Sequence, residues 1–248
     1  MGLLGSIAVA GTAAPAFADG EEASSGFSGY ITLTSDYRFR GISQSDNGAA
    51  LQAAVNYTHE SGLFAEVWAS NIDFSPFGDS DSAIEVDLTL GWAAALTDVT
   101  SMSVKAVYYM YPDADIAPGD PDYDYWEFIA GLERKFGSST TASLEVAYSP
   151  ETFAEGGAAW AVTGGLAFPL MEKLWFFEGL EASGHFGVQA FDDAGLADYT
   201  FWDLGLSTTY GALTLDARYV DTDLDVIECG LDACEGGMMF SATFEWGG

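Results

Sequence analysis

Residues 29–71 read GYITLTSDYRFRGISQSDNGAALQAAVNYTHESGLFAEVWASN. From Phe27 to Phe39 the odd-numbered residues are mostly apolar and the even-numbered residues mostly polar, which is the period of a β-strand with one apolar face. After a polar connection the alternation returns in 51–58, and after a tight break at 60–62 it returns again in 63–71. Strands of about ten residues, joined by one long and one very short connection, are typical of an outer-membrane β-barrel.

The rest of the chain repeats this pattern, one hairpin at a time. We therefore predict an all-β fold, a transmembrane antiparallel up-and-down barrel of about twelve strands, whose even strand number puts both termini on the periplasmic side. The eighth strand is expected to end at Pro169, and 170–181 show no clear alternation. The predicted strands are 27–39, 51–58, 63–71, 84–92, 102–111, 126–133, 142–148, 160–168, 186–190, 202–210, 213–219 and 240–246.

The composition agrees with a membrane barrel. The chain has 248 residues, of which 49% are hydrophobic and 15% aromatic, yet no apolar run beyond the N-terminus is long enough for a spanning helix. A barrel needs no such run, because its lipid-facing residues come at every second position. A soluble lipocalin-like barrel is the alternative, but twelve strands exceed its eight.

The N-terminal residues indicate export. An apolar stretch leads to Ala16, Phe17 and Ala18, so we expect 1–18 to be a signal peptide that is cleaved before Asp19, leaving 19–248 as the barrel. The basic residues that usually begin a signal peptide are missing, and a longer precursor would supply them. The predicted location is the cell outer membrane, in contact with lipid and lipopolysaccharide. The last strand ends at Trp246 and resembles the aromatic-terminated strands that the barrel assembly machinery recognises.

The charge is strongly acidic. Seven basic residues against 38 acidic ones give a formal net charge of -31. Nucleic acid is therefore excluded as a partner, because phosphate binding needs the opposite sign. The charge is compatible with a solvated acidic surface, and also with a field that attracts cations and repels anions.

Two short motifs carry a resemblance to a known family. The run SDYRFRGISQS, Ser35 to Ser45, is followed by the strand end NY at Asn56 and by VWASN, Val67 to Asn71. This arrangement resembles the TorF-type porins of proteobacteria; outside the motifs the likeness is mainly one of hairpin spacing. That family has no established substrate, so the resemblance implies an outer-membrane barrel with a porin-like role and no particular solute.

Charged residues on the polar faces of the strands are expected to line the pore. Near the outer mouth, Asp36 and Arg38 lie two apart, with Arg40 just beyond; they could polarise the pore or form an ion pair that pins the first loop to the wall. Carboxylates outnumber basic groups, which favours cations. The predicted pore-lining residues are Asp36, Arg38, Glu85, Asp87, Lys105, Glu127, Glu145, Asp203, Asp216, Arg218 and Glu245.

The last predicted outer loop holds both cysteines, Cys229 and Cys234. In an exported protein we expect them to form a disulfide, since two thiols alone make a poor metal site. The same loop contains Asp221, Asp223, Asp225, Glu228 and Asp232, a spacing that partly resembles a calcium loop. Val226 stands where such a loop needs glycine, so we expect neither a metal site nor a cofactor here or in the acidic loop 113–124.

The residues available for catalysis are few. His59 falls at a predicted turn, and Ser183 and His185 are neighbours on one strand face without a third orienting group. We therefore expect a non-enzymatic protein, a channel for passive diffusion of small solutes that prefers cations. A plugged structural or adhesive barrel is the main alternative, and an outer-membrane hydrolase using Ser183 and His185 is a second.

Overall fold

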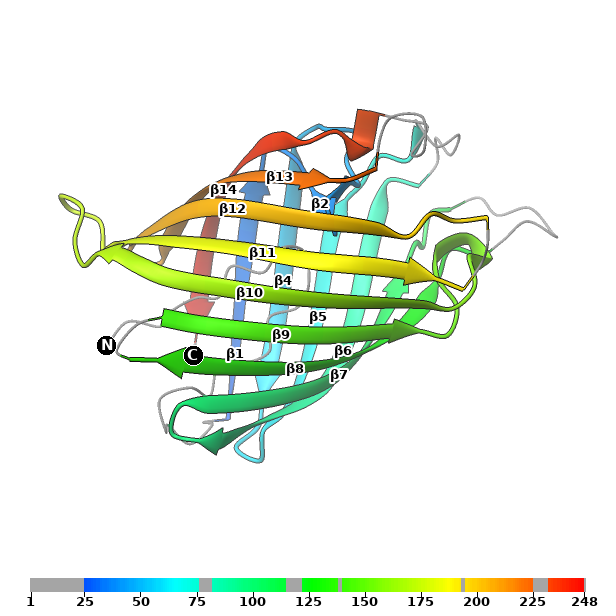
Figure 1. The fold of residues 1–248 in the computed structure, drawn as a ribbon. Helices are drawn as coiled ribbons and strands as arrows, with labels where there is room; N and C mark the ends of the chain where they lie inside the picture. The colour runs from blue at the N-terminus through cyan, green and yellow to red at the C-terminus, as the bar shows by residue number, and fades with distance from the viewer. Residues whose placement is uncertain are drawn as a thin grey trace.

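The computed structural model describes residues 25–75, 82–114, 122–137, 140–192, 195–224 and 232–247. The predicted signal peptide, Cys229, and parts of the acidic loops 113–124 and 221–232 lie outside these residues. Twelve strands form one closed antiparallel barrel, which confirms the predicted fold (Figure 1). The barrel strands are β1 (Gly26–Thr34), β4 (Ala50–Thr58), β5 (Leu63–Asn71), β6 (Ile84–Thr97), β7 (Thr100–Met110), β8 (Tyr125–Phe136), β9 (Thr140–Ser149), β10 (Ala159–Met171), β11 (Leu180–Phe191), β12 (Tyr199–Tyr210), β13 (Leu213–Thr222) and β14 (Gly237–Gly247).

Each barrel strand pairs with the next one along the chain, and β1 closes the barrel by pairing with β14. In that closing pair Ile31 lies opposite Phe244. Two further strands, β2 (Arg38–Phe39) and β3 (Ile42–Ser43), form a separate small hairpin. Short 3₁₀ helices, η2 (Phe153–Glu155) and η3 (Asp232–Cys234), lie in the connections after β9 and β13. No helix in the described parts of the chain is long and apolar enough to cross a membrane.

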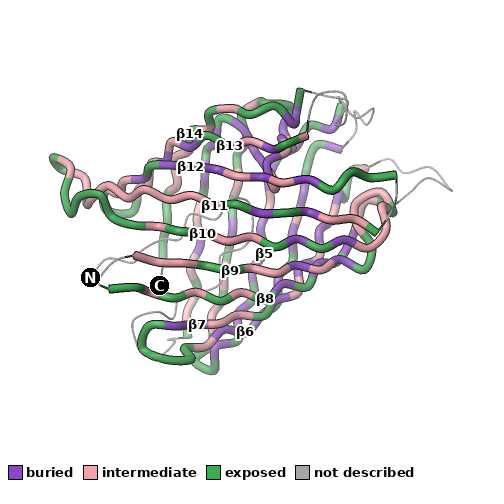
Figure 2. Tube along the Cα trace, viewed as in Figure 1, coloured by how far each residue is buried: buried purple, intermediate pink, exposed green. Residues whose placement is uncertain are grey.

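Alternation along each strand separates an apolar outer face from a polar inner face. Leu63 and Val67 of β5 are each 52% exposed, whereas Glu66, between them, is 4% exposed. Figure 2 shows the same exchange of exposed and buried positions along much of β6 and β12. A barrel wall that is apolar outside and polar inside is the arrangement that a lipid bilayer stabilises.

The connections at the two ends of the barrel differ in length. At the end where β1 begins, called the turn end here, β4 and β5 are joined through Gly62, and β12 and β13 through Gly211. The opposite end, called the loop end, carries most of the longer connections, including 35–49 and 111–124; the connection 172–179 is the long one at the turn end. This division agrees with the predicted pattern of short turns and long loops.

Most predicted strand ends shift by one to a few residues in the structure, and three of the shifts have an identifiable physical reason. The first strand ends at Thr34 and not at Phe39, because the chain turns into the barrel there. The eighth continues past Pro169 to Met171, with a shift of register that accommodates the missing proline N–H. The ninth begins at Leu180 and not at Phe186, since glycine and polar residues obscure its alternation.

Candidate functional site: the barrel interior

The inner segment, defined as residues 35–49, leaves the barrel wall and folds into the interior. Ser35 still pairs with β14, where its backbone N–H donates to the Phe240 carbonyl at 2.9 Å. Beyond it, the β2–β3 hairpin turns through Arg40 and Gly41, whose φ angles are 47° and 89°. Positive φ at both central residues is the requirement of a two-residue hairpin turn of type I′. Glycine is also needed for space, because a Cβ at position 41 would lie 2.3 Å from the Thr222 methyl group.

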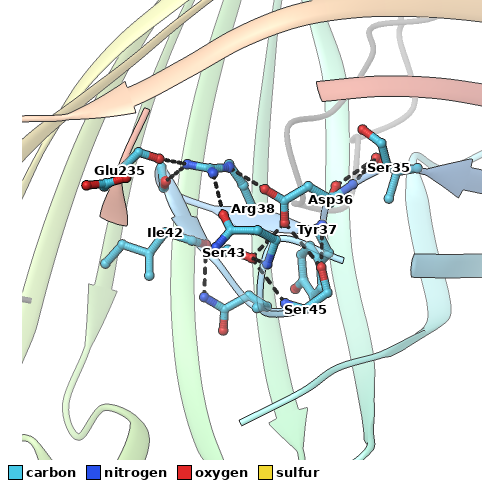
Figure 3. A network of polar contacts seen from close by, with 12 residues as sticks. Ser35, Asp36, Tyr37, Arg38, Ile42, Ser43, Ser45 and Glu235 are labelled. Atoms are coloured by element: carbon cyan, nitrogen blue, oxygen red, sulfur yellow. Dashed lines mark hydrogen bonds and ion pairs between the residues drawn. The ribbon is translucent and has the colours of Figure 1, made fainter. Parts of the chain in front are cut away.

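Asp36 is the acceptor that holds the inner segment in shape (Figure 3). Its Oδ1 accepts from the hydroxyls of Ser43 at 2.6 Å and Ser45 at 3.2 Å, while its Oδ2 accepts from Arg38 Nε at 2.5 Å. The Ser45 hydroxyl also accepts from the backbone N–H of Tyr37 at 2.9 Å. The run Ser35 to Ser45, on which the predicted resemblance to the TorF-type porins rests, therefore forms this hydrogen-bonded turn.

Arg38 joins the inner segment to the connection between β13 and β14. Its Nη1 donates to the carbonyls of Glu235 at 2.7 Å and Gly41 at 3.1 Å, and its Nη2 donates to Asn47 Oδ1 at 2.8 Å. The residue is 5% exposed. Of the two roles considered for Asp36 and Arg38, this geometry matches the ion pair that pins the first loop.

Aromatic side chains pack around the inner segment and fill the loop end of the barrel. Tyr37 packs edge-on against Trp68 of β5, with ring centroids 5.4 Å apart. Phe39 contacts Tyr109 of β7 at 5.9 Å, and Tyr109 stacks on Tyr125 of β8 at 4.5 Å. The charged residues of the strands were predicted to line a pore, with a plugged barrel as the alternative; in the described residues this half of the interior is a packed cluster.

Arg40 links the inner segment to strands β8 and β11 on the opposite side of the barrel. Its Nη2 donates to Glu127 Oε1 of β8 at 2.8 Å, and its Nη1 donates to Gln189 Oε1 of β11 at 2.9 Å. Neither strand is a neighbour of β1 or β4, between which the segment lies in the chain. Glu127 also accepts from the Tyr109 hydroxyl at 3.2 Å. One guanidinium thus fixes the segment to two strands that it does not adjoin.

A second charged cluster lies on the inner face of β11 to β13. Arg218 is 1% exposed and contacts carboxylate oxygens of both Asp203 and Asp216; Nη2 lies 3.2 Å from Asp216 Oδ2. The same Nη2 donates to the Ser183 hydroxyl at 3.0 Å. His185 Nδ1 lies 3.0 Å from Asp203 Oδ2. This cluster joins three of the predicted lining residues in one ion-pair network.

The contacts of Ser183 bear on the hydrolase alternative. In the described part of the chain its Oγ hydrogen bonds to Arg218 and not to His185, while His185 contacts Asp203. A serine nucleophile needs a base within hydrogen-bonding distance. The described geometry supplies a histidine–carboxylate pair, but it does not join that pair to the serine.

The other predicted lining residues have varied surroundings. Glu85, Asp87 and Lys105 are buried on the inner faces of β6 and β7, and Lys105 Nζ lies 3.9 Å from Glu145 Oε2. The Glu145 side chain is 43% exposed, in the more open half near the turn end. Glu245 is exposed at the turn end of β14.

Sequence reasoning omitted Glu66 and Gln189 from the inner face. Glu66 could have been found from the alternation alone. Val67 faces outward, so the residue before it must face inward. Gln189 was missed because only charged residues were selected as pore-lining residues, and glutamine carries no charge. Its role depends on Arg40, which is 149 residues away in the chain.

The acidic run that begins at the end of β13 binds backbone groups in its described part. Asp223 Oδ1 accepts from the Thr200 N–H at 2.6 Å, and Asp221 Oδ1 accepts from the Thr222 N–H at 2.9 Å. Among the described residues no group of three or more His, Cys, Asp or Glu side chains is arranged to hold a metal ion. Asp225 and Glu228 lie outside these residues.

The disulfide between Cys229 and Cys234 stays a prediction, because Cys229 is outside the described residues. Cys234 is buried in η3, which lies beside strand β3 of the inner segment. We expect mass spectrometry of protein purified without reductant to find the two residues linked, since the chain is predicted to be exported to an oxidising compartment. Recovery of two alkylated thiols from unreduced protein would contradict this expectation.

Comparison with known proteins places the chain in a family. The model of a family described as "Bacterial protein of unknown function (Gcw_chp)" matches residues 18–239. The chain belongs to this family. The Gcw_chp description names no activity, so the resemblance to the TorF-type porins stays a prediction. No protein with a curated description matches the sequence.

Solved structures of porins share the barrel fold of this chain. The KdgM porin in complex with disordered oligogalacturonate superposes with a TM-score of 0.56 at 4% identity, over 90% of this chain and 99% of that one. The NanC porin gives 0.52 at 8% identity, over 90% and 98%. LpxR from Salmonella typhimurium gives 0.51 at 7% identity, over 88% and 99%. At such low identity the likeness concerns the barrel alone.

Proposed function

We propose that this protein is an outer-membrane channel of the porin type, which passes small solutes by passive diffusion and prefers cations. The observation that carries the proposal is the combination of a closed barrel, an apolar outer face and an inner face rich in charged groups. An inner face of this kind is costly in a barrel that excludes water and is expected in one that conducts.

The preference for cations rests on the charges of the inner face. In the described strands and inner segment, carboxylates outnumber basic side chains. A low-dielectric wall concentrates their field and raises the local concentration of cations. The KdgM porin was solved in complex with disordered oligogalacturonate, which is an anion. The carboxylate-rich interior of the present barrel favours cations instead. The inward-facing carboxylates are Asp36, Glu66, Glu85, Asp87, Glu127, Glu133, Glu145, Glu181, Asp203, Asp216 and Glu245, and the basic groups are Arg38, Arg40, Lys105, Lys135 and Arg218.

The inner segment is the constriction in this proposal. It fills the loop end of the barrel, whereas Glu145 and His185, nearer the turn end, have side chains that are 43% and 25% exposed. A wide vestibule would therefore lead to a narrow passage beside residues 35–49. Conduction through such a passage is expected to be small and sensitive to charge.

Planar bilayers test the proposal directly. In a KCl gradient the purified protein is expected to give a reversal potential that favours K⁺ over Cl⁻. The preference should weaken as salt rises, because the Debye length falls from about 10 Å at 0.1 M to about 3 Å at 1 M. Preference for Cl⁻ would refute the charge argument while leaving a channel.

A plugged structural barrel is the second candidate, and the packing of the inner segment favours it. Arg40 fixes the segment to β8 and β11, and Arg38 fixes it to the connection before β14. If these contacts hold the passage shut, inserted protein will give no conductance at any voltage. Heat-modifiable migration on gels would show that such a silent sample is folded.

A further inference from the structure

Four buried oxygens on β5 and β6 have no hydrogen-bond partner. They are Glu66 Oε1, Glu85 Oε2, Asp87 Oδ1 and Thr89 Oγ1, and their residues are 3–6% exposed. Among the described residues these are all of the buried side-chain oxygens and nitrogens left without a partner. Buried polar groups are normally paired, so a concentration of unpaired oxygens at one place needs an explanation.

The strand register brings the four side chains onto one patch of the inner wall. Glu66 of β5 lies directly opposite Thr89 of β6, and the next inward pair is Trp68 opposite Asp87. Glu85 follows Asp87 at two residues along the same face of β6. Directly opposed and diagonal neighbours on one face of a sheet are within reach of each other's side chains. The patch is called the β5–β6 oxygen patch below.

Among the described residues, few basic groups lie beside the patch. Glu85 Oε1 accepts from the Tyr111 hydroxyl at 3.2 Å, and Asn56 and Lys105 are close to Glu66. The other nearby cation, Arg40, is bound to Glu127 and Gln189. One Lys105 charge, which also faces Glu145, is shared among several carboxylates. Like charges at this spacing and burial repel strongly, and a bound cation would relieve that repulsion.

The donor set indicates which kind of cation fits. All of the unpaired atoms are carboxylate or hydroxyl oxygens, which are ligands for hard cations. The described carboxylates are not gathered closely enough to chelate a compact metal ion. A larger, weakly hydrated cation can instead be held by oxygens spread along a wall, as in the filters of cation channels.

We propose that the β5–β6 oxygen patch binds a monovalent cation of the size of potassium. This inference rests on the proposed function and deepens it. The patch lies beside the inner segment and would be the binding site at which a permeating cation loses part of its hydration shell. Thr89 and the two carboxylates nearest to it, Glu66 and Asp87, are the main ligands; Glu85 contributes charge. The site does not require that the barrel conduct, so binding can be tested separately.

Trp68 provides the measurement. It lies between Glu66 and Ser70 on the inner face and is 6% exposed, whereas Trp92, Trp126, Trp160 and Trp246 are exposed on the strands and Trp175 in a turn. Thallium(I) nitrate in chloride-free buffer is the probe, because Tl⁺ has nearly the charge and size of K⁺ and quenches indole fluorescence. The signal is the difference between the full chain and its Trp68→Phe variant, both in detergent micelles.

We expect this Trp68 signal to fall along a saturable curve as Tl⁺ rises, and K⁺ to compete for the same site. Glu66→Gln combined with Asp87→Asn should raise the half-saturating Tl⁺ concentration at least about tenfold, the effect of losing charged ligands in a partly shielded site. Thr89→Val, which preserves shape, should raise it less. Glu133→Gln is the matched control: it removes an inward carboxylate of β8 nearer the turn end and should leave the curve unchanged.

Linear quenching that the Glu66 and Asp87 replacements leave unchanged would overturn the site, because it would report collisions alone. If the protein with both the Glu66 and Asp87 replacements does not fold, two other measurements still test the site. These are Tl⁺ binding by Thr89→Val and the effect of K⁺ on the unfolding temperature of the unaltered chain. Saturable binding in a protein that gives no conductance would retain the site and refute the channel. Conductance without saturable binding would refute the site and retain the channel.

Discussion

Replacing Arg218 by alanine is expected to lower the free energy of unfolding by about 3–5 kcal/mol, the typical cost of removing one partner from a buried ion pair. Arg218 is 1% exposed and contacts both Asp203 and Asp216. Its loss leaves two carboxylates facing each other without the guanidinium that contacts both, and His185 contacts Asp203. Urea unfolding from detergent micelles or lipid vesicles, followed by tryptophan fluorescence, measures the change.

Two further variants separate charge from packing. Arg134→Ala removes an exposed guanidinium from β8 whose side chain donates to Thr100, and should change stability by less than about 0.5 kcal/mol. Combining Arg218→Met with Asp203→Asn and Asp216→Asn removes the whole charged set and should restore most of the loss, since neutral replacement of a buried ion cluster is often tolerated. A stable Arg218→Ala protein would mean that water reaches the two carboxylates.

The second large effect is expected at Arg40. Asparagine removes the guanidinium that holds the inner segment to Glu127 and Gln189, and it tolerates the positive φ of this position. The segment should then move more freely, and the unitary conductance in planar bilayers should rise at least about twofold as the passage widens. Glu127→Gln, which weakens one of the same contacts, should give a smaller rise.

Arg134→Asn is the matched control for conductance, because it removes an arginine of β8 that lies near the turn end. It should leave the conductance unchanged. If Arg40→Asn conducts no better than the unaltered protein, residues 35–49 are held by the remaining contacts of Asp36 and Arg38. A closed unaltered protein that opens on this substitution would favour the plugged barrel with a removable anchor.

The sequence alone determined the barrel. Alternation is a local property: Leu63 and Val67 on one face and Glu66 and Trp68 on the other predict both the strand and which of its faces meets lipid. Short turns alternating with long loops then give the strand order without knowledge of any long-range contact. The largest failure of this reasoning in the wall, at 180–185, occurred where glycine and polar residues hide the period.

Only the tertiary structure decided what lies inside the barrel. Residues 35–39 alternate as a strand does, yet they leave the wall, because Asp36 finds Arg38, Ser43 and Ser45 within its own turn. The fate of Arg40 depends on Glu127 and Gln189, which are 87 and 149 residues away and give no local signal of that contact. A period of two tells which side of a wall a side chain faces, but the partners that it meets across the interior depend on the closure of the whole barrel.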